Sequence, residues 1–204
     1  MADAIVAGAL AGYAIAIPVG AMAVLVVDAG LTAGFRTGFA AGLGVASADL
    51  LYAVVAAFAG AAIATVLEPW ETALALASAA VLAGFAVMLA LRARRLAAAG
   101  PAEPPPARPA RTYARFLGLT IVNPPTIALF AAIVVGMGAD ALPGVDDRGA
   151  FALAVFVASA SWQTLLAVVG SVAHRHLPDG ARVWASLAGA AVIALLAVRT
   201  ALGA

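Results

Sequence analysis

Long runs of apolar residues follow one another along the chain, and short stretches between them carry most of the charge. Each run reaches the roughly 20 residues that a helix needs to cross the hydrocarbon core of a bilayer. The pattern therefore predicts an all-α membrane protein with six transmembrane helices. The expected spans are residues 4–27, 37–66, 72–91, 116–139, 149–173 and 183–202.

Composition supports a membrane environment and narrows the chemistry. Hydrophobic residues make up 65% of the 204 residues and charged residues 10%, whereas soluble domains are about half apolar and about a quarter charged. The net charge of +1 gives no argument for a nucleic-acid partner. The absence of cysteine excludes disulfides and thiolate metal sites. No phosphate-binding GxxxxGK[ST] motif is present, so we expect no ATP hydrolysis. A membrane-embedded enzyme or redox carrier is a further alternative, but the predicted spans contain no cysteine and no histidine, so we expect no enzyme activity and no cofactor.

Arginine is distributed unevenly between the predicted loops. Nine of the 11 basic residues, all arginine, fall on one predicted side of the membrane, six of them between residues 92 and 115. Cytoplasmic loops are enriched in basic residues, so this side is predicted to be cytoplasmic, with both termini outside. The apolar run at the start of the chain has no basic segment before it and is too long for a signal-peptide core, which favours a retained span.

The central Pro- and Arg-rich stretch predicts a linker between two halves. We expect residues 1–92 and 116–204 to form three spans each, joined by a cytoplasmic linker at residues 93–115. Two halves with an odd number of spans insert in opposite orientations. This is the arrangement of an inverted repeat, as found in many secondary transporters.

Both halves are predicted to open with a broken helix. Pro18 and Gly20 interrupt the first span, and Asn123, Pro124 and Pro125 interrupt the fourth. Proline removes a backbone donor and disrupts the preceding turn, and a carbonyl freed in hydrocarbon needs another partner. Breaks at matching places in both halves indicate a polar site between them, where helix N-termini would favour an anionic group. The alternative is that the prolines only shape helix packing.

Asp49 lies in the middle of the second span, where a charge costs at least about 2.5–3.5 kcal/mol. Either a residue of another span pairs with it, or it is protonated, or it faces water. We interpret it as the group that binds a cationic part of a substrate or carries a coupling proton. The alternative is a protonated, purely structural carboxyl.

The fifth span carries a second polar patch, in which Trp162 and Gln163 are candidate lining residues. Its Ser and Thr residues are more typical of contacts between helices.

Asp28 is interpreted as a solvated charge at the end of the first span, or as a gate partner of Arg36. His174 and His176 are placed in a loop, since a metal site needs more ligands. Glycines at every fourth position from residue 30 to residue 42 indicate close helix packing, with homodimerisation as one outcome.

Together these features resemble the lysine exporter (LysE/RhtB) family of amino-acid exporters. The stretch "IPVGAMAVLVVDAGLTAGFRTGFAAGLGVASADLLYA" at residues 17–53 combines a Pro-Gly break, a glycine ladder and an intramembrane Asp. "LTIVNPPTIALF" at residues 119–130 is similar to the Asn-Pro segment that opens the family's second half. Two segments depart from the family pattern, and both bear on the substrate. Pro18-Val19-Gly20 stands where the family usually has Pro-Gly-Pro, and Pro125 stands where Lys is frequent.

The resemblance implies an exporter of amino acids or similar small zwitterionic metabolites in the bacterial inner membrane, driven by a proton or ion gradient. The substrate would bind near mid-membrane, where Asp49 would hold an ammonium group or a proton. The predicted substrate-binding residues are Pro18, Gly20, Asp49, Asn123, Pro124, Pro125, Trp162 and Gln163. The rivals are a cation exporter of a related fold, which would use Asp28 and Asp49 as oxygen ligands, and a non-transporting membrane scaffold.

Overall fold

The computed structural model describes residues 1–17, 21–67, 108–123, 142–176 and 178–202, together with scattered positions between 73 and 94 and between 126 and 130. Every regular element in these parts of the chain is a helix. The helices are α1 (Ala2–Ala16), α2 (Ala21–Ala33), α3 (Phe35–Leu67), α5 (Pro109–Ile121), α7 (Val145–His176) and α8 (Asp179–Leu202).

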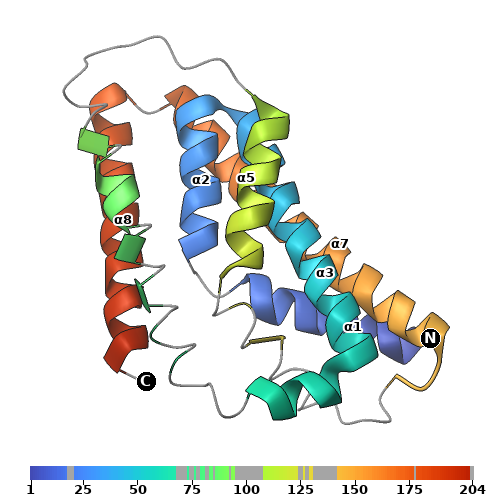
Figure 1. Ribbon diagram of the computed structural model, residues 1–204. Helices are drawn as coiled ribbons and strands as arrows, with labels where there is room; N and C mark the ends of the chain where they lie inside the picture. The colour runs from blue at the N-terminus through green and yellow to red at the C-terminus, as the bar shows by residue number, and fades with distance from the viewer. Residues whose placement is uncertain are drawn as a thin grey trace.

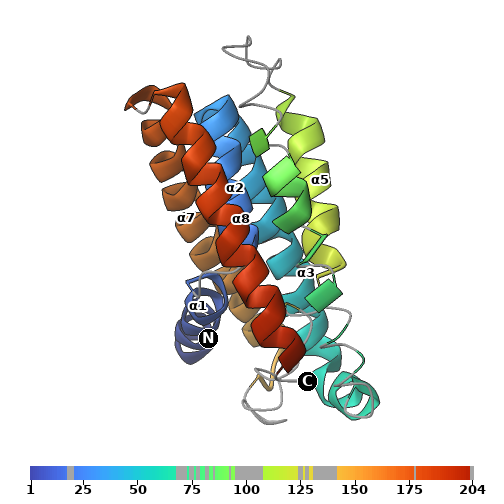
Figure 2. The ribbon, with the colours of Figure 1, turned by 90° about the vertical axis from the view of Figure 1, so that its left-hand side faces the viewer.

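The helices pack as a bundle with one helix lying across its end. In Figures 1 and 2, α2, α3, α5 and α7 run next to one another, while α1 crosses near one end of the bundle. The ends of α2 and α7 and the starts of α3, α5 and α8 lie together at the opposite end. The helix ends gathered here include Arg36 at the start of α3, Arg108 and Arg111 at the start of α5, and Arg175 in the last turn of α7, four of the arginines that were assigned to one side of the membrane.

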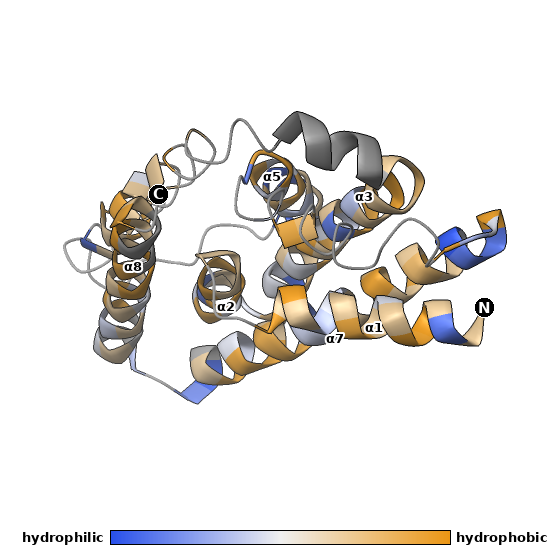
Figure 3. Ribbon diagram, turned by 90° about the horizontal axis from the view of Figure 1, so that it is seen from below, coloured by the Kyte–Doolittle hydropathy of each residue, from blue (hydrophilic) through white to orange (hydrophobic). Residues whose placement is uncertain are grey.

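Two helices of the described chain are long and apolar enough to cross a membrane. The qualifying stretches are Phe35–Ala59 of α3 and Val145–Ala173 of α7, and α1 with α2 qualifies as a third, broken span. A shorter apolar stretch, Val183–Leu195, lies in α8. Figure 3 shows hydrophobic residues along most of each helix. Many large apolar side chains of α7 and α8 are exposed, as expected of helices that face lipid. The six-span inverted repeat stays a prediction, since most of residues 68–107 and 124–141 lies outside the described chain.

The predicted interruption of the first span is present. Helix α1 ends at Ala16, α2 starts at Ala21, and the two axes differ in direction by 75°. The predicted fifth and sixth spans also correspond to helices, α7 and α8. His174 and His176 belong to the last turn of α7, so the assignment of both to a loop was wrong.

The start of the fourth span was predicted too late. Helix α5 starts at Pro109, so residues 109–115 of the predicted linker are helical. Proline suits this position because the first helical residues have no intrahelical partner for their N–H groups. Arg111 and Arg115 interrupt the apolar run, so the apolar pattern predicted a later start for this helix. Helix α5 is amphipathic and buries Phe116 and Thr120.

Glycines bring the helices into close contact. A Cβ atom on Gly170 of α7 would collide with the carbonyl oxygen of Val27 in α2, and one on Gly8 of α1 would collide with the carbonyl oxygen of Phe151 in α7. Gly42 of α3 would bring a Cβ to 2.8 Å from Cβ of Gln163. The predicted close packing is therefore confirmed. These contacts lie within one chain, so the glycine ladder alone gives no support for a homodimer.

Gly34 is the exception in the ladder, because it forms a turn instead of a packing contact. Its φ of +78° is a left-handed conformation that glycine adopts without strain. Its N–H donates to the Gly30 carbonyl at 2.9 Å, which ends α2, and α3 starts at the next residue. Gly34 thereby turns the chain back so that α2 and α3 pack against each other.

We expect Gly170→Ala to lower the free energy of unfolding by about 1–3 kcal/mol, the usual cost of overpacking. The colliding atom belongs to the α2 backbone and has no rotamer through which to move away. The matched control is Gly149→Ala in the same helix, where a Cβ would meet no atom of the described chain within 4 Å. Thermal unfolding of the detergent-solubilised protein would measure both variants, and equal stability of the two would contradict the packing argument.

Candidate functional site

Asp49 forms the polar centre of the contact between α3 and α7. Its side chain is buried, and its Oδ2 atom accepts a hydrogen bond of 2.6 Å from Oγ of Ser159. Small residues of α3, including Gly42 and Ala46, allow α7 to approach closely enough for this bond. The structure therefore identifies Ser159, a residue of the second predicted polar patch, as the cross-helix partner of Asp49.

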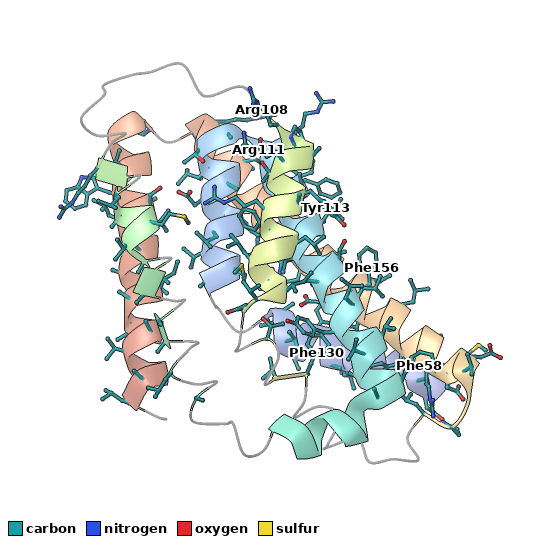
Figure 4. All side chains as sticks on the ribbon, viewed as in Figure 1. Phe58, Arg108, Arg111, Tyr113, Phe130 and Phe156 are labelled. Atoms are coloured by element: carbon teal, nitrogen blue, oxygen red, sulfur yellow. The ribbon has the colours of Figure 1, made fainter. Side chains whose placement is uncertain are left out.

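Two tyrosines connect α3 to α5 on either side of Asp49. Tyr113 of α5 donates a hydrogen bond of 3.0 Å to Oγ of Ser47, and Figure 4 shows Tyr113 on the side of α5 that faces α3. Tyr52, one turn after Asp49, donates a bond of 2.5 Å to the carbonyl oxygen of Ile121, the last residue of α5. Since a carbonyl at a helix C-terminus lacks an intrahelical donor, Tyr52 provides one. The end of α5 is thus fixed next to the Asp49 turn of α3.

Asn123 lies two residues after the end of α5, beyond the C-cap residue Val122, and is buried. Its Nδ2 donates to Oγ1 of Thr126 at 3.0 Å, and its backbone N–H donates to the Thr120 carbonyl at 3.0 Å. Its Oδ1 atom has no hydrogen-bond partner in the described chain. A buried amide oxygen without a partner is costly, and the described chain supplies no donor to this one. Pro18, Gly20, Pro124 and Pro125 lie outside the described residues.

The neighbours Trp162 and Gln163 face different parts of the bundle. Gln163 is buried against Gly42 of α3, on the Asp49 side of α7. Trp162 lines a cavity of about 200 Å³ with residues of α2 and α8, among them Asp28 and Ser186. Oε1 of Gln163 and Nε1 of Trp162 both lack a hydrogen-bond partner in the described chain. The sequence assigned both to one site, but in the structure only Gln163 shares the α3–α7 contact with Asp49.

Asp28 is not the solvated end charge expected from the sequence. Helix α2 continues past it to Ala33, and its side chain is only 4% exposed. Its Oδ1 atom accepts a hydrogen bond of 2.5 Å from Oγ of Ser186 in α8. Helix α2 ends at Ala33, later than the predicted span end at residue 27, so Asp28 lies within the packed part of the helix.

A larger cavity of about 490 Å³ opens beside Asp28, between α2, α5 and residues 88–89. Arg108, Arg111 and Arg115 line the α5 wall, and Figure 4 shows Arg108 and Arg111 at the end of α5 next to α2. These arginines were predicted to be loop charges, and the cavity was not predicted. Their spacing of three and four residues could have predicted this arrangement, because residues at that spacing share one face of a helix.

The described residues contain no group of three or more His, Cys, Asp or Glu side chains that could hold a metal ion. Asp28 and Asp49, the carboxylates that a cation exporter would use, bind serines of different helices. Polar groups therefore occupy two separate parts of the bundle: Asp49 and Gln163 lie in the α3–α7 contact, and Asp28 and three arginines line the cavity between α2 and α5.

Comparison with known proteins gives the family. The family model described as "LysE type translocator" matches residues 13–203, which is nearly the whole chain. No curated protein and no solved structure matches the chain. The match includes the broken first span, the Asp49 helix and the segment around Asn123, the regions on which the resemblance was based. The chain belongs to the LysE type translocator family.

Proposed function

We propose that this membrane protein is a secondary active exporter of amino acids or similar small zwitterionic metabolites. It would work in the bacterial inner membrane as a multi-pass protein coupled to protons or another ion. Membership of a translocator family supports a transport role. The amino-acid substrate and the coupling go beyond that match and rest on the site.

The observation that carries the proposal is the buried Asp49–Ser159 pair. It joins the centres of α3 and α7, the two longest helices of the described chain, with 33 and 32 residues. An ionisable group at this depth is expensive and marks substrate, ion or proton pathways in transporters. Substrate binding or proton exchange at Asp49 would alter the contact between the two halves. Alternating access by movement of one half against the other is the mechanism that this geometry supports best.

The ends of the broken helices support a substrate site near Asp49. Tyr52 holds the C-terminal carbonyl of α5 beside the Asp49 turn, and the amide oxygen of Asn123, shortly after it, has no donor among the described residues. Helix α2 starts at Ala21, directly after the first break. An amino acid carries an ammonium group and a carboxylate. The ammonium group suits Asp49 and the Asn123 oxygen, and the carboxylate suits the N–H groups at the start of a broken helix.

We expect cells that express the protein and are loaded with dipeptides to release one or a few amino acids faster than cells with an empty vector. Intracellular peptidases raise the amino-acid pool, so an exporter would be detected through its product in the medium. Quantifying all released amino acids would identify the substrate. The membrane fraction should be checked for the inserted protein.

Two other results would contradict the proposal. Equal release with and without inserted protein would exclude amino-acid export. Raised resistance to a panel of metal salts, without amino-acid release, would favour the cation exporter, which would use Asp28 and Asp49 as ligands.

A further inference from the structure

Three arginines of α5 line one wall of the cavity between α2, α5 and residues 88–89, which we call the arginine cavity. They are Arg108, Arg111 and Arg115, and all three are exposed. The volume of about 490 Å³ lies within the range of about 300–1,000 Å³ that is typical of small-molecule sites. Among the described residues, none of the three arginines forms an ion pair. The α5 wall therefore carries positive charge that no described carboxylate pairs with.

Asp28 also lines the arginine cavity, but we assign no ligand contact to it. Its side chain is only 4% exposed, and Ser186 of α8 donates a hydrogen bond to its Oδ1 atom. Its carboxylate thus takes part in the packing of α2 against α8. One buried carboxylate against three arginines leaves an excess of positive charge in the described lining, so the cavity favours an anion.

The arginines are suited to a phosphate group. Arg115 donates from Nη2 to the Sδ atom of Met88 at 2.9 Å, and a thioether is a weak acceptor. Guanidinium groups bind phosphate with two parallel, charge-assisted hydrogen bonds. Residues three and four positions apart are neighbours on one helix face, so Arg111 can contribute to the same anion as Arg108 or Arg115. A phosphate at this face would replace the weak acceptor of Arg115 with a strong one.

Aromatic residues place these arginines at the level of lipid headgroups. Tyrosine and tryptophan are enriched where a membrane meets water. Tyr113 stands between Arg111 and Arg115 in the first turns of α5, and Figure 4 shows it next to Arg111 along the helix. Trp184, which is 73% exposed, lies in the second turn of α8, and α8 starts at the same end of the bundle. The charged wall of the cavity therefore lies where a leaflet presents its phosphates.

The lining changes from charged to apolar along the cavity. On α5 the arginines come first, and Phe116 and Leu119 follow toward the middle of the bundle. A helix rises 1.5 Å per residue, so Leu119 lies about 16 Å further along α5 than Arg108. Helix α2 ends where α5 starts, and its Leu25 lines the cavity from the earlier, inner part of that helix. A molecule with an anionic head and apolar chains matches this order, whereas a soluble anion would use only the charged part.

We propose that the arginine cavity binds an anionic phospholipid of the leaflet at the arginine-bearing end. The arginines bind its phosphate, and its acyl chains extend along Leu25, Phe116 and Leu119. Basic pockets between transmembrane helices on the cytoplasmic side are suited to anionic lipid headgroups. The bound lipid connects α2 to the first turns of α5 and stabilises their packing. This partner goes beyond the proposed export function and is independent of the exported substrate.

Thermal unfolding of the detergent-purified protein would measure the binding, because a ligand of the folded state raises the unfolding temperature. We expect a saturable rise with dioleoyl-phosphatidylglycerol. Dioleoyl-phosphatidylcholine has the same phosphate and chains, but its choline group offsets the charge, so half-saturation should need about tenfold more lipid. Glycerol 3-phosphate has the phosphate without the chains and should cause no shift. Native mass spectrometry should retain one phosphatidylglycerol per chain.

Paired variants assign the binding to the cavity. Arg111→Gln/Arg115→Gln should raise the half-saturating amount of phosphatidylglycerol about tenfold or more. The matched control, Arg36→Gln/Arg175→Gln, removes the same charge from exposed arginines at the same end that do not line the cavity, and should respond like the unmodified protein. If the first double variant does not fold, Arg111→Gln against Arg175→Gln gives the same comparison.

Three results would overturn the proposal. Equal stabilisation by phosphatidylglycerol and phosphatidylcholine would show that the cavity does not select an anionic headgroup. An equal loss of response in both double variants would assign the effect to the total charge of this end of the molecule. Saturation by glycerol 3-phosphate alone would assign the cavity to a soluble phosphorylated compound. Efflux from cells is measured separately, so each of these results would reject the lipid site and leave the export function intact.

Discussion

We expect the Asp49→Asn variant to fold, insert and lose export. Asparagine has nearly the same shape as aspartate, and its amide oxygen can still accept the hydrogen bond from Ser159. It cannot ionise, so it neither carries a proton nor neutralises an ammonium group. Breaking a buried charge pair costs about 3–5 kcal/mol, and each 1.4 kcal/mol is a factor of ten. The export rate should therefore fall by about 100-fold or more.

Reconstituted vesicles would separate the two roles assigned to Asp49. If Asp49 carries the coupling proton, Asp49→Asn should still exchange labelled substrate between equal concentrations on both sides, but should not concentrate it against a gradient. If Asp49 binds the substrate ammonium group, both activities should be lost. Full gradient-driven export by a folded Asp49→Asn protein would show that the carboxyl is structural and would contradict the proposed function.

Two control variants make this result specific to Asp49. Asp146→Asn removes an exposed carboxylate from the first turn of α7 and should export at the normal rate. Ser159→Ala removes the partner of Asp49 but keeps the carboxyl, so its export should fall less than that of Asp49→Asn. A Ser159→Ala protein as inactive as Asp49→Asn would mean that the position of the carboxyl matters as much as its charge.

The features of the fold that sequence predicted are those with local causes. Proline and glycine disrupt a helix by their own geometry, so the interruption between α1 and α2 was predictable from residues 18–20. Apolar length alone predicted α3 and α7. The start of α5 was not predictable in this way, because its first two turns carry arginines that an apolar count excludes, and these arginines line a cavity formed by other helices.

The candidate site was predicted in part for the same reason. Asp49 was predictable as a site residue, because the cost of placing a charge inside an apolar run can be inferred from the sequence alone. Its partner Ser159 was one of several polar residues of the fifth span, and helix rotation alone decides which of them faces α3. The rotation that turns Ser159 and Gln163 toward α3 turns Trp162 toward Asp28. Asp28 was misread because its burial depends on where the chain turns, at Gly34.

Tyr52→Phe tests whether the broken end of α5 is fixed to the Asp49 helix. The variant keeps the ring that stacks on Phe130 at a centroid distance of 5.4 Å and removes only the hydroxyl that donates to the Ile121 carbonyl. A backbone carbonyl left without a donor in hydrocarbon costs several kcal/mol. We expect the variant to unfold at a lower temperature in detergent, with a loss of about 2 kcal/mol or more.

Tyr13→Phe is the matched control, since it also removes one tyrosine hydroxyl from a helix contact. Tyr13 shares a hydrogen bond of 2.9 Å with Oγ of Ser161, and that serine also donates to the Ala158 carbonyl at 2.7 Å. Its loss leaves no backbone group without a partner, so the free energy of unfolding should change by less than about 1 kcal/mol. If Tyr52→Phe also exports more slowly at a temperature where it is fully folded, the position of the α5 end controls transport. Equal stability of the two variants would show that the Ile121 carbonyl has another donor, and that the end of α5 is free to move independently of Asp49.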